Sequence, residues 1–507
     1  MRRAQVYAVN SVVAVLSWCV VQAPAQASRQ VAHVDSAGAW IETEVGAPDT
    51  SLAPERDQPE RHFVERAGIV WSTNYPRAIV NKVAAADLMN ETWLALNTND
   101  QDLSYLQTDG DVTPVWDYPV TGNPSNVVVA SAEVVSLAVV GVMRGTTLTL
   151  YAFSGSSSIP IWTYPFTDGY DVLQWYALDV SADGQIVVAA ASKDWGPDSR
   201  VVILNGATGG ELVRTQRPIS IEAAELCADG SRVVLSESNW VRIYETAGLT
   251  LLYEFQAWGG GGIHRISRDG KIVIGAGFDV RVVKDNGSGW HRIYMYGESG
   301  MWYGDGAAFS GDGNTLLWVA NDYATYQQTV WGVIDLVTGT ELGRKTTQGT
   351  GTWQDFPARS QGSYDGRVFA SATWGTQNNV HPEVQVFDRQ ANVIGSIDTP
   401  GSPFDLDLTA DGHFVVVGCK HVHANVTGMG GDAYVYAVPP QALPGDLNCD
   451  GTVNFGDINP FVLALTGQAP YEAAFPNCRW LNGDVNGDGH VNFADINPFV
   501  ALLSGNP

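Results

Sequence analysis

Two stretches of twelve residues near the C-terminus carry the side chains best suited to chemistry. The first runs from Asp446 to Asp457 (DLNCDGTVNFGD), and the second runs from Asp484 to Asp495 (DVNGDGHVNFAD), 38 residues later. Each places oxygen-bearing side chains at positions 1, 3, 5, 9 and 12 and glycine at position 6. A hard divalent cation takes roughly six to eight oxygen ligands, and a twelve-residue loop that bends at its sixth residue supplies them. The duplicated spacing predicts two metal sites of this kind.

These donors predict one hard divalent cation in each loop. Position 7 contributes through its backbone carbonyl. The predicted ligands are Asp446, Asn448, Asp450, Thr452, Asn454 and Asp457 in the first loop, and Asp484, Asn486, Asp488, His490, Asn492 and Asp495 in the second. Each loop is followed by the same apolar run, INPFVLAL from Ile458 and INPFVALL from Ile496, which is typical of a short helix.

Residues 445–507 resemble a type I dockerin, the small domain that attaches secreted bacterial proteins to cohesin-bearing scaffolds. The resemblance lies in the paired Asp-x-Asn-x-Asp-Gly loops, and it implies two calcium ions, a near-twofold pair of loop–helix segments and a cohesin-like or other scaffold partner. The chain departs from the pattern at positions 10 and 11, which are Phe455-Gly456 and Phe493-Ala494. The two phenylalanines are candidates for partner contact or for core packing. The prolines at 460 and 498 are expected to interrupt the helices after about one turn.

Four cysteines remain outside the N-terminal segment. Cys449 and Cys478 flank the first calcium loop, and a disulfide between them is expected because so small an exported domain gains from a covalent link. Cys227 and Cys419 fall in strands far apart in the chain and are expected to be free, buried thiols.

The rest of the chain offers less chemistry. It contains no glycine-rich phosphate loop, no Gly-x-Ser-x-Gly motif and no His-Glu-x-x-His motif. Cys419, His421 and His423 would share one face of a strand, but three such residues on one strand rarely complete a metal site, so ordinary packing is the main expectation.

Aromatic residues are the candidates for ligand binding in this region. Trp175, Trp258, Trp302 and Trp353 each precede the first strand of a repeat, and further aromatics fall in loops that would open on the same face. They are predicted to bind a ligand such as a sugar at one mouth of a central channel. The alternative is that these tryptophans pack between neighbouring sheets.

The elements that position these residues are short strands. Residues 307–345 contain four strand-like runs, at 307–310, 315–320, 329–336 and 341–345, separated by turns such as Gly311-Asp312-Gly313. One antiparallel sheet of about 40 residues is too small to bury its own faces. Neighbouring repeats of the same chain must therefore cover the faces of this sheet.

The unit recurs along the chain. Asp-Gly turns stand at Asp183, Asp229, Asp269, Asp312, Asp365 and Asp411, with spacings of 46, 40, 43, 53 and 46 residues. Four strands in about 40–50 residues are typical of a β-propeller. Two earlier units, which end in VWDYP and IWTYP, lack the Asp-Gly turn. Together these units predict a mainly β protein with an eight-bladed β-propeller over residues 66–438, or a seven-bladed one if an early unit is an insertion.

The last repeat supplies only three strands before Pro439-Pro440. Residues 69–76 (IVWSTNYP) resemble the outer strands of the early units and are expected to complete it, which closes the ring and removes exposed sheet edges. The Trp-ended units resemble quinoprotein-type blades, and the Asp-Gly units resemble WD40-like blades. The resemblance implies a fold and no cofactor.

The ends of the chain indicate export. Residues 1–27 read as a signal peptide, with Arg2-Arg3, an apolar core and Ala25-Gln26-Ala27 as the cleavage pattern. Residues 28–65 are expected to be a mobile leader and residues 439–444 a linker. The mature protein is therefore expected to be secreted or held at the cell surface, with no membrane insertion. A formal net charge of −26 argues against nucleic acid as a partner.

Two functions fit this organisation. The first is an exported, non-catalytic propeller that binds a glycan or a protein and is tethered by the calcium domain. The second is a dockerin-borne glycoside hydrolase or lyase active in polysaccharide catabolism, which would need paired carboxylates facing one pocket, with Asp168, Asp171, Asp322 and Asp355 as candidates.

Overall fold

The computed structural model describes most of the chain from residue 68 onward. The described residues are 68–75, 78–86, 91–97, 102–108, 114–119, 126–257, 264–304, 306–325, 327–349, 357–375, 381–423, 430–439, 444–448, 453–475, 478, 480–486 and 490–504. The predicted signal peptide and leader lie outside these residues. The chain divides into two compact units, residues 1–438 and residues 439–507, called here the N-terminal and C-terminal units.

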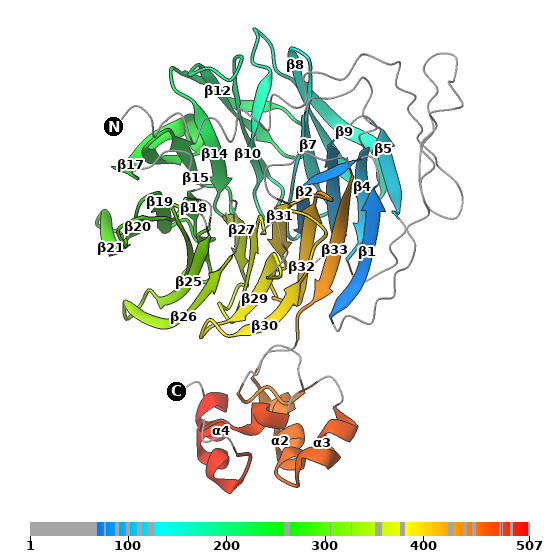
Figure 1. Cartoon of the computed structure of the whole chain (residues 1–507), viewed down its shortest axis with the longest axis vertical. Coiled ribbons are helices and arrows are strands. Elements are labelled where there is room, and N and C mark those ends of the chain that lie inside the picture. Colours follow the sequence, from blue (N-terminus) through cyan, green and yellow to red (C-terminus); the bar gives the residue numbers. More distant parts are fainter. Residues whose placement is uncertain are drawn as a thin grey trace. The chain divides into compact units, whose positions relative to one another are not determined.

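The N-terminal unit is built of four-stranded antiparallel sheets that follow one another along the chain (Figure 1). The first five comprise β2 (Ile79–Ala86), β3 (Glu91–Asn97), β4 (Asp102–Gln107) and β5 (Trp116–Pro119); β6 (Asn126–Ser131), β7 (Ala138–Arg144), β8 (Thr147–Ser154) and β9 (Ser157–Pro165); β10 (Val172–Val180), β11 (Ile186–Ser192), β12 (Ser199–Asn205) and β13 (Glu211–Arg217); β14 (Ile221–Leu226), β15 (Arg232–Glu237), β16 (Trp240–Glu245) and β17 (Thr250–Gln256), with the 3-10 turn η2 (Ala247–Leu249); and β18 (Arg265–Ile266), β19 (Ile272–Ala276), β20 (Val280–Asp285) and β21 (Trp290–Tyr296).

The remaining sheets include the repeat from which the architecture was predicted. Its predicted strands correspond to β23 (Ala308–Phe309), β24 (Thr315–Asp322), β25 (Gln328–Asp335) and β26 (Thr340–Gln348), with β22 (Met301–Trp302) also paired to β24. The last two sheets comprise β27 (Pro357–Gly362), β28 (Val368–Thr373), β29 (Val384–Asp388) and β30 (Val393–Ile397), then β31 (Pro403–Leu408), β32 (Phe414–Cys419), β33 (Gly431–Ala437) and β1 (Ile69–Tyr75). The sheets stand around a common centre, with the first strand of each sheet innermost, which is the arrangement of a β-propeller (Figure 1).

The ring is closed by strand exchange, as predicted. β1 pairs antiparallel with β33, from Ile69 opposite Tyr436 to Tyr75 opposite Gly431. Trp71 on β1 is buried at 6% exposure in a core shared with Val80 and Val435. β1 is therefore the fourth, outer strand of the last sheet and also contributes apolar contacts to its core.

The Asp-Gly turns share one hydrogen-bond pattern. In the turn at Asp312, the Ser310 hydroxyl donates to the aspartate at 2.5 Å, and the backbone N–H of Asn314 donates to the same oxygen at 2.9 Å. Gly313 has φ +72°, a conformation that glycine adopts at little cost. The same contacts recur at Asp183, Asp269, Asp365 and Asp411, and Cys227 replaces the hydroxyl at Asp229.

The C-terminal unit is helical, with α2 (Ile458–Ala464), α3 (Gln468–Ala474), α4 (Ile496–Leu503) and the 3-10 turns η3 (Phe455–Asp457), η4 (Trp480–Gly483) and η5 (Phe493–Asp495). Phe461 and Phe499 stack at 4.2 Å between ring centroids and join the two repeated segments in one core. Pro460 and Pro498 stand in the first turn of α2 and α4, where a missing N–H costs little. The expected interruption of these helices is therefore wrong. No helix among the described residues is long and apolar enough to span a membrane.

Removing β1 should open the ring. A variant that begins at residue 78 lacks β1, so the edge of β33 is unpaired and the apolar residues that pack against Trp71 are exposed. We therefore expect its melting temperature to fall by about 10 °C or more. Differential scanning calorimetry measures this, with a variant that begins at residue 61 as the control. Equal effects of the two truncations would contradict closure through β1.

Candidate functional site

The two predicted calcium loops have matching local structure. In the first loop, one carboxylate oxygen of Asp457 accepts the backbone N–H groups of Leu447 (2.8 Å) and Asn448 (3.0 Å), and the other accepts Asn454 N–H at 2.8 Å. In the second loop, Asp495 accepts the corresponding N–H groups of Val485, Asn486 and Asn492 at 2.9, 3.1 and 2.8 Å. The sequence duplication is thus a structural duplication.

The described ligand positions of these loops carry carboxylate and amide oxygens, except His490 at position 7, which would contribute through its backbone carbonyl. Asp457 and Asp495 are fully buried and Asp446 is 3% exposed, so each loop has a buried carboxylate at its final position. Oxygen donors of this kind suit a hard cation such as calcium. Asp450, Thr452 and Asp488 lie outside the described residues. Within the described ranges, no group of three or more His, Cys, Asp or Glu side chains is arranged as a metal site.

Cys478 is disulfide-bonded, and its predicted partner Cys449 lies outside the described residues. Cys227 and Cys419 are free and buried, as predicted. His421 pairs with Asp432 at 2.8 Å and His423 pairs with Glu383 at 2.9 Å, so the two histidines contact different carboxylates.

Phe455 and Phe493 are exposed, at 77% and 79%. The α2 and α4 helices then expose the same two further positions, Ile458 with Val462 and Ile496 with Val500. Core packing of the two phenylalanines, one of the two expectations for them, is therefore wrong. The same three apolar side chains are thus exposed after each loop, and these six residues are called here the duplicated apolar surface.

The predicted aromatic rim is only partly described. Trp302 is buried at 3% exposure in β22, so its ring offers no face to a ligand, and the packing alternative holds for it. Trp175 lies within β10, and the prediction that it precedes the first strand of its repeat is wrong; it is half-buried and meets Phe404 edge-on at 5.6 Å. Trp258 and Trp353 lie outside the described residues. Trp195, in a loop after β11, is 45% exposed.

The candidate catalytic acids of the N-terminal unit make local contacts. Asp168 pairs with Arg200 at 3.2 Å, Asp171 accepts Asp194 N–H at 3.2 Å, and Asp322 accepts N–H groups of its own loop. Asp355 lies outside the described residues.

A cavity of about 250 Å³ occupies the centre of the N-terminal unit and is called here the central chamber. The inner strands β2, β10, β14, β18, β27 and β31 all contribute to its wall. Its charged lining residues are Lys82, Glu133, Asp179, Glu225, Arg265, Arg268, Arg359, Asp405 and Asp407.

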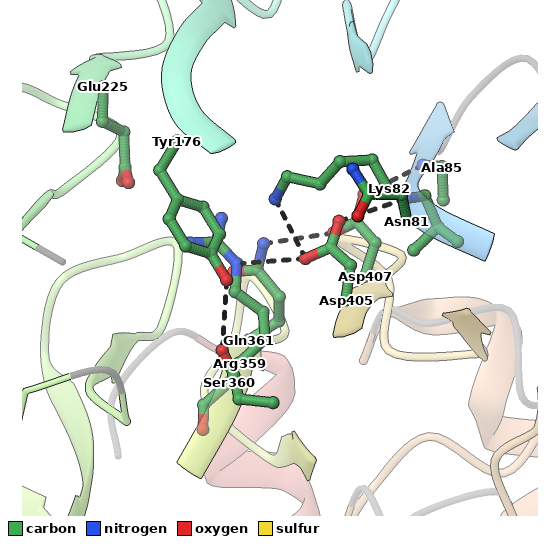
Figure 2. Close-up of polar contacts among 12 residues, drawn as sticks. Asn81, Lys82, Ala85, Tyr176, Glu225, Arg359, Ser360, Gln361, Asp405 and Asp407 are labelled. Atoms are coloured by element: carbon green, nitrogen blue, oxygen red, sulfur yellow. Dashed lines mark hydrogen bonds and ion pairs between the residues drawn. The ribbon is translucent and has the colours of Figure 1, made fainter. Parts of the chain in front are cut away.

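Two ion pairs dominate the chamber wall. Lys82 Nζ lies 3.2 Å from Asp405 and 3.8 Å from the centroid of the Tyr176 ring (Figure 2). Arg265 pairs with Glu225 at 2.8 Å and also donates to the Ser360 carbonyl and to Gln361. Burial lowers the pKa of Lys82 to about 8 although Asp405 favours its charged form.

The carboxylates also join neighbouring inner strands. Asp405 and Asp407 on β31 accept Val83 N–H at 3.1 Å and Ala85 N–H at 2.9 Å from β2 (Figure 2). Asp179 on β10 accepts Leu226 N–H on β14 at 2.7 Å. These amides stand on the inner edge of their strands, where the ladder offers no partner. Side-chain carboxylates therefore accept the backbone N–H groups of the strand edges that face the central chamber.

Two of these acids have pKa values well above the usual value for aspartate. Burial raises the pKa of Asp179 to about 7, and the neighbouring Glu225 adds to the shift. Burial likewise raises the pKa of Asp407 to about 6. The chamber could not be predicted from the sequence, because seven of its charged residues come from six separate strands and the other two from the turns after β6 and β18. Only the alternation of residues on each first strand could have indicated which side chains face inward.

Comparisons with known proteins support the fold. The N-terminal region is similar to BamB from Moraxella catarrhalis (TM-score 0.50, 13% identity, 73% of this chain and 99% of that one). It is also similar to the C-terminal WD40 domain of Sif2 (TM-score 0.51, 13% identity, 74% and 99%) and to the Dos1 propeller (TM-score 0.51, 12% identity, 72% and 93%). Similarity at this level of identity establishes a β-propeller fold and no function. No protein-family model and no curated protein matches the sequence.

The raised pKa of Asp179 predicts a pH-dependent stability. Because the folded-state pKa lies above the unfolded value of 3.8, the contribution of Asp179 is fully present below about pH 4 and is lost as the pH rises through 7. In Asp179→Asn, which cannot ionise, we expect the fall in unfolding free energy between pH 5 and pH 8 to be smaller by about 1–2 kcal/mol, a value reduced for residual solvent contact. Urea denaturation at both pH values measures it.

Asp168→Asn is the control for this experiment. Arg200 and Thr167 hold the pKa of Asp168 below its usual value, so its contribution does not change between pH 5 and pH 8. An identical pH dependence in Asp179→Asn and the unmodified protein would contradict the assignment.

Proposed function

We propose that this protein is an exported, non-catalytic binding module. Its N-terminal unit is an eight-bladed β-propeller that binds a glycan or a protein on its loop-rich face. Its C-terminal unit is a dockerin-like domain that binds two calcium ions and attaches the protein to a cohesin-like or other scaffold or cell-surface partner. The four-stranded sheets, with β1 completing the last, support eight blades over seven.

The duplicated apolar surface is the observation that carries this proposal. Folded monomers rarely leave grouped large apolar side chains in water unless a partner covers them. Here the exposed side chains recur at the same positions after both loops, with Val462 at 56% and Val500 at 54%. A folded protein partner fits such a surface, because apolar contacts can anchor an interface at its centre.

Calcium would hold this surface in place. Each loop ends in the 3-10 turn that carries the exposed phenylalanine, and the capping boxes Asn454–Asp457 and Asn492–Asp495 fix that turn against the loop. Oxygen ligands gathered by the ion would therefore orient the partner surface directly. The chemistry supplied by calcium is structural: it offsets the repulsion among the loop carboxylates.

Binding is preferred to polysaccharide degradation for the propeller because each described candidate acid is already held by another group of the chain: Asp168 by Arg200, Asp171 by Asp194 N–H, and Asp322 by N–H groups of its own loop. A glycan array combined with a reducing-sugar assay on the full chain tests this preference. We expect retained ligand without release of new reducing ends. Sustained release of reducing ends that is lost in one of the variants Asp168→Asn, Asp171→Asn and Asp322→Asn would favour the hydrolase or lyase instead.

The C-terminal unit should fold only with calcium. Its core is small, and without cations the carboxylates of each loop repel one another, so binding energy must supply folding energy. In the isolated segment 439–507, we expect EDTA to remove most helical circular dichroism and calcium to restore it. Calorimetry should show two ions, with Asp446→Ala and Asp484→Ala each removing about one equivalent.

The disulfide could hold the segment compact without metal, so both redox states are compared. A reduced, calcium-free segment with the same spectrum as the calcium form would contradict metal-dependent folding.

A further inference from the structure

Two contacts join sheets that are not neighbours across the central chamber. Tyr176 on β10 donates its hydroxyl to the Ala358 carbonyl on β27 at 3.2 Å, across 182 residues of sequence. Arg268, after β18, pairs with Glu133, after β6. All of these except Ala358 are among the lining residues of the chamber. Side chains of the chamber wall thus meet across the ring at two places.

Tyr176 reaches this position because β10 leaves its ladder. The register between β10 and β11 shifts between Leu173 and Leu178, and Tyr176 instead makes a single parallel bridge to Ala223 on β14. A bulge of this kind redirects side chains. It places the Tyr176 ring beside Lys82 and Arg359, at 3.8 and 4.9 Å from the ring centroid (Figure 2).

Arg359 differs from the other cations of the chamber. Lys82 has Asp405, and Arg265 has Glu225, Ser360 and Gln361 as partners. The nearest described carboxylate to the Arg359 guanidinium is Asp405, at 3.9 Å from Nε, and that Nε is buried without a hydrogen-bond partner in the part of the chain that the structure describes. A guanidinium presents five N–H donors in a planar fork that matches an oxyanion.

We propose that the central chamber binds a small oxyanion, a carboxylate or a sulfate- or phosphate-sized group, through the guanidinium of Arg359. The remaining charges of the chamber are compatible with this ligand. Asp405 and Glu225 are neutralised by Lys82 and Arg265, and Glu133 by Arg268. Asp179 and Asp407 have no ion-pair partner among the described residues. Their raised pKa values, about 7 and about 6, leave Asp179 mostly protonated and Asp407 about half protonated at pH 6, and a protonated carboxyl can donate a hydrogen bond to the anion.

This site differs from the ligand face and from the calcium-dependent surface proposed above. It lies on the inner strands, it needs no calcium, and it takes a small anion instead of a glycan or a protein. The tests of the two sites are therefore independent.

Isothermal titration of the full chain with sodium sulfate and with sodium acetate, against sodium chloride at equal ionic strength, tests the proposal. We expect saturable binding of at least one of the two oxyanions at pH 6 and weaker binding at pH 8, because Asp179 and Asp407 ionise and Lys82, with a pKa of about 8, loses part of its positive charge. Arg359→Gln should weaken binding at least about ten-fold, because it removes a charge-assisted pair of hydrogen bonds. Arg367→Gln is the matched control: Arg367 is a half-exposed turn residue that pairs with Asp365 at 3.3 Å, and its loss should change nothing.

Arg359→Lys covers the case in which the glutamine variant fails to fold. It keeps the charge beside Tyr176 but loses the planar fork, so we expect intact melting behaviour with binding weakened several-fold. No saturable binding by either oxyanion, or equal binding by the unmodified protein and the Arg359 variants, would overturn the proposal. Acetate without sulfate binding would identify a carboxylate ligand, and the reverse would identify a tetrahedral anion.

Discussion

The N-terminal unit depends on how the free edges of its small sheets are satisfied. A four-stranded sheet has an outer and an inner edge, and each carries backbone groups without a ladder partner. At the outer edge these groups reach water. At the inner edge, carboxylates from the neighbouring inner strand accept several of them, as Asp407 does for Ala85 and Asp179 does for Leu226. This structural requirement places acids around the channel, and burial there raises their pKa values. The chemistry of the central chamber therefore follows from the way the sheets are joined.

The turn side of the ring uses a second set of connections. Each serine or threonine that precedes an Asp-Gly turn bonds its aspartate, and backbone bonds then link successive turns, such as Ala182 N–H to the Ala228 carbonyl and Ala228 N–H to the Arg268 carbonyl. Adjacent sheets are thus connected at the turns and again at the inner strands. In the C-terminal unit, the buried aspartate at the end of each loop has a similar part. Each of these aspartates accepts hydrogen bonds from three backbone N–H groups of its own loop.

Most of the fold could be predicted from the sequence, whereas the central chamber could not. The Asp-Gly period predicted the sheets because each turn needs a glycine at positive φ and an aspartate to accept local N–H groups, which is a purely local requirement. The closing strand could be predicted because residues 69–76 resemble other outer strands. The chamber could not, since Val83 and Asp405 meet across 322 residues with no local signature. Trp302 and Phe455 were ambiguous for a related reason: the burial of an aromatic ring depends on its neighbours in space.

Hydrogen–deuterium exchange at the inner-strand amides tests most directly whether carboxylates join the sheets at the channel. The Ala85 amide has no ladder partner on its inner side, yet it should exchange as slowly as amides within the β2–β3 ladder, because Asp407 accepts its hydrogen. In Asp407→Ala this protection should disappear at Ala85, while protection at Leu94 in β3 persists. Fast exchange of Ala85 in the unmodified protein, or unchanged protection in Asp407→Ala, would contradict the account.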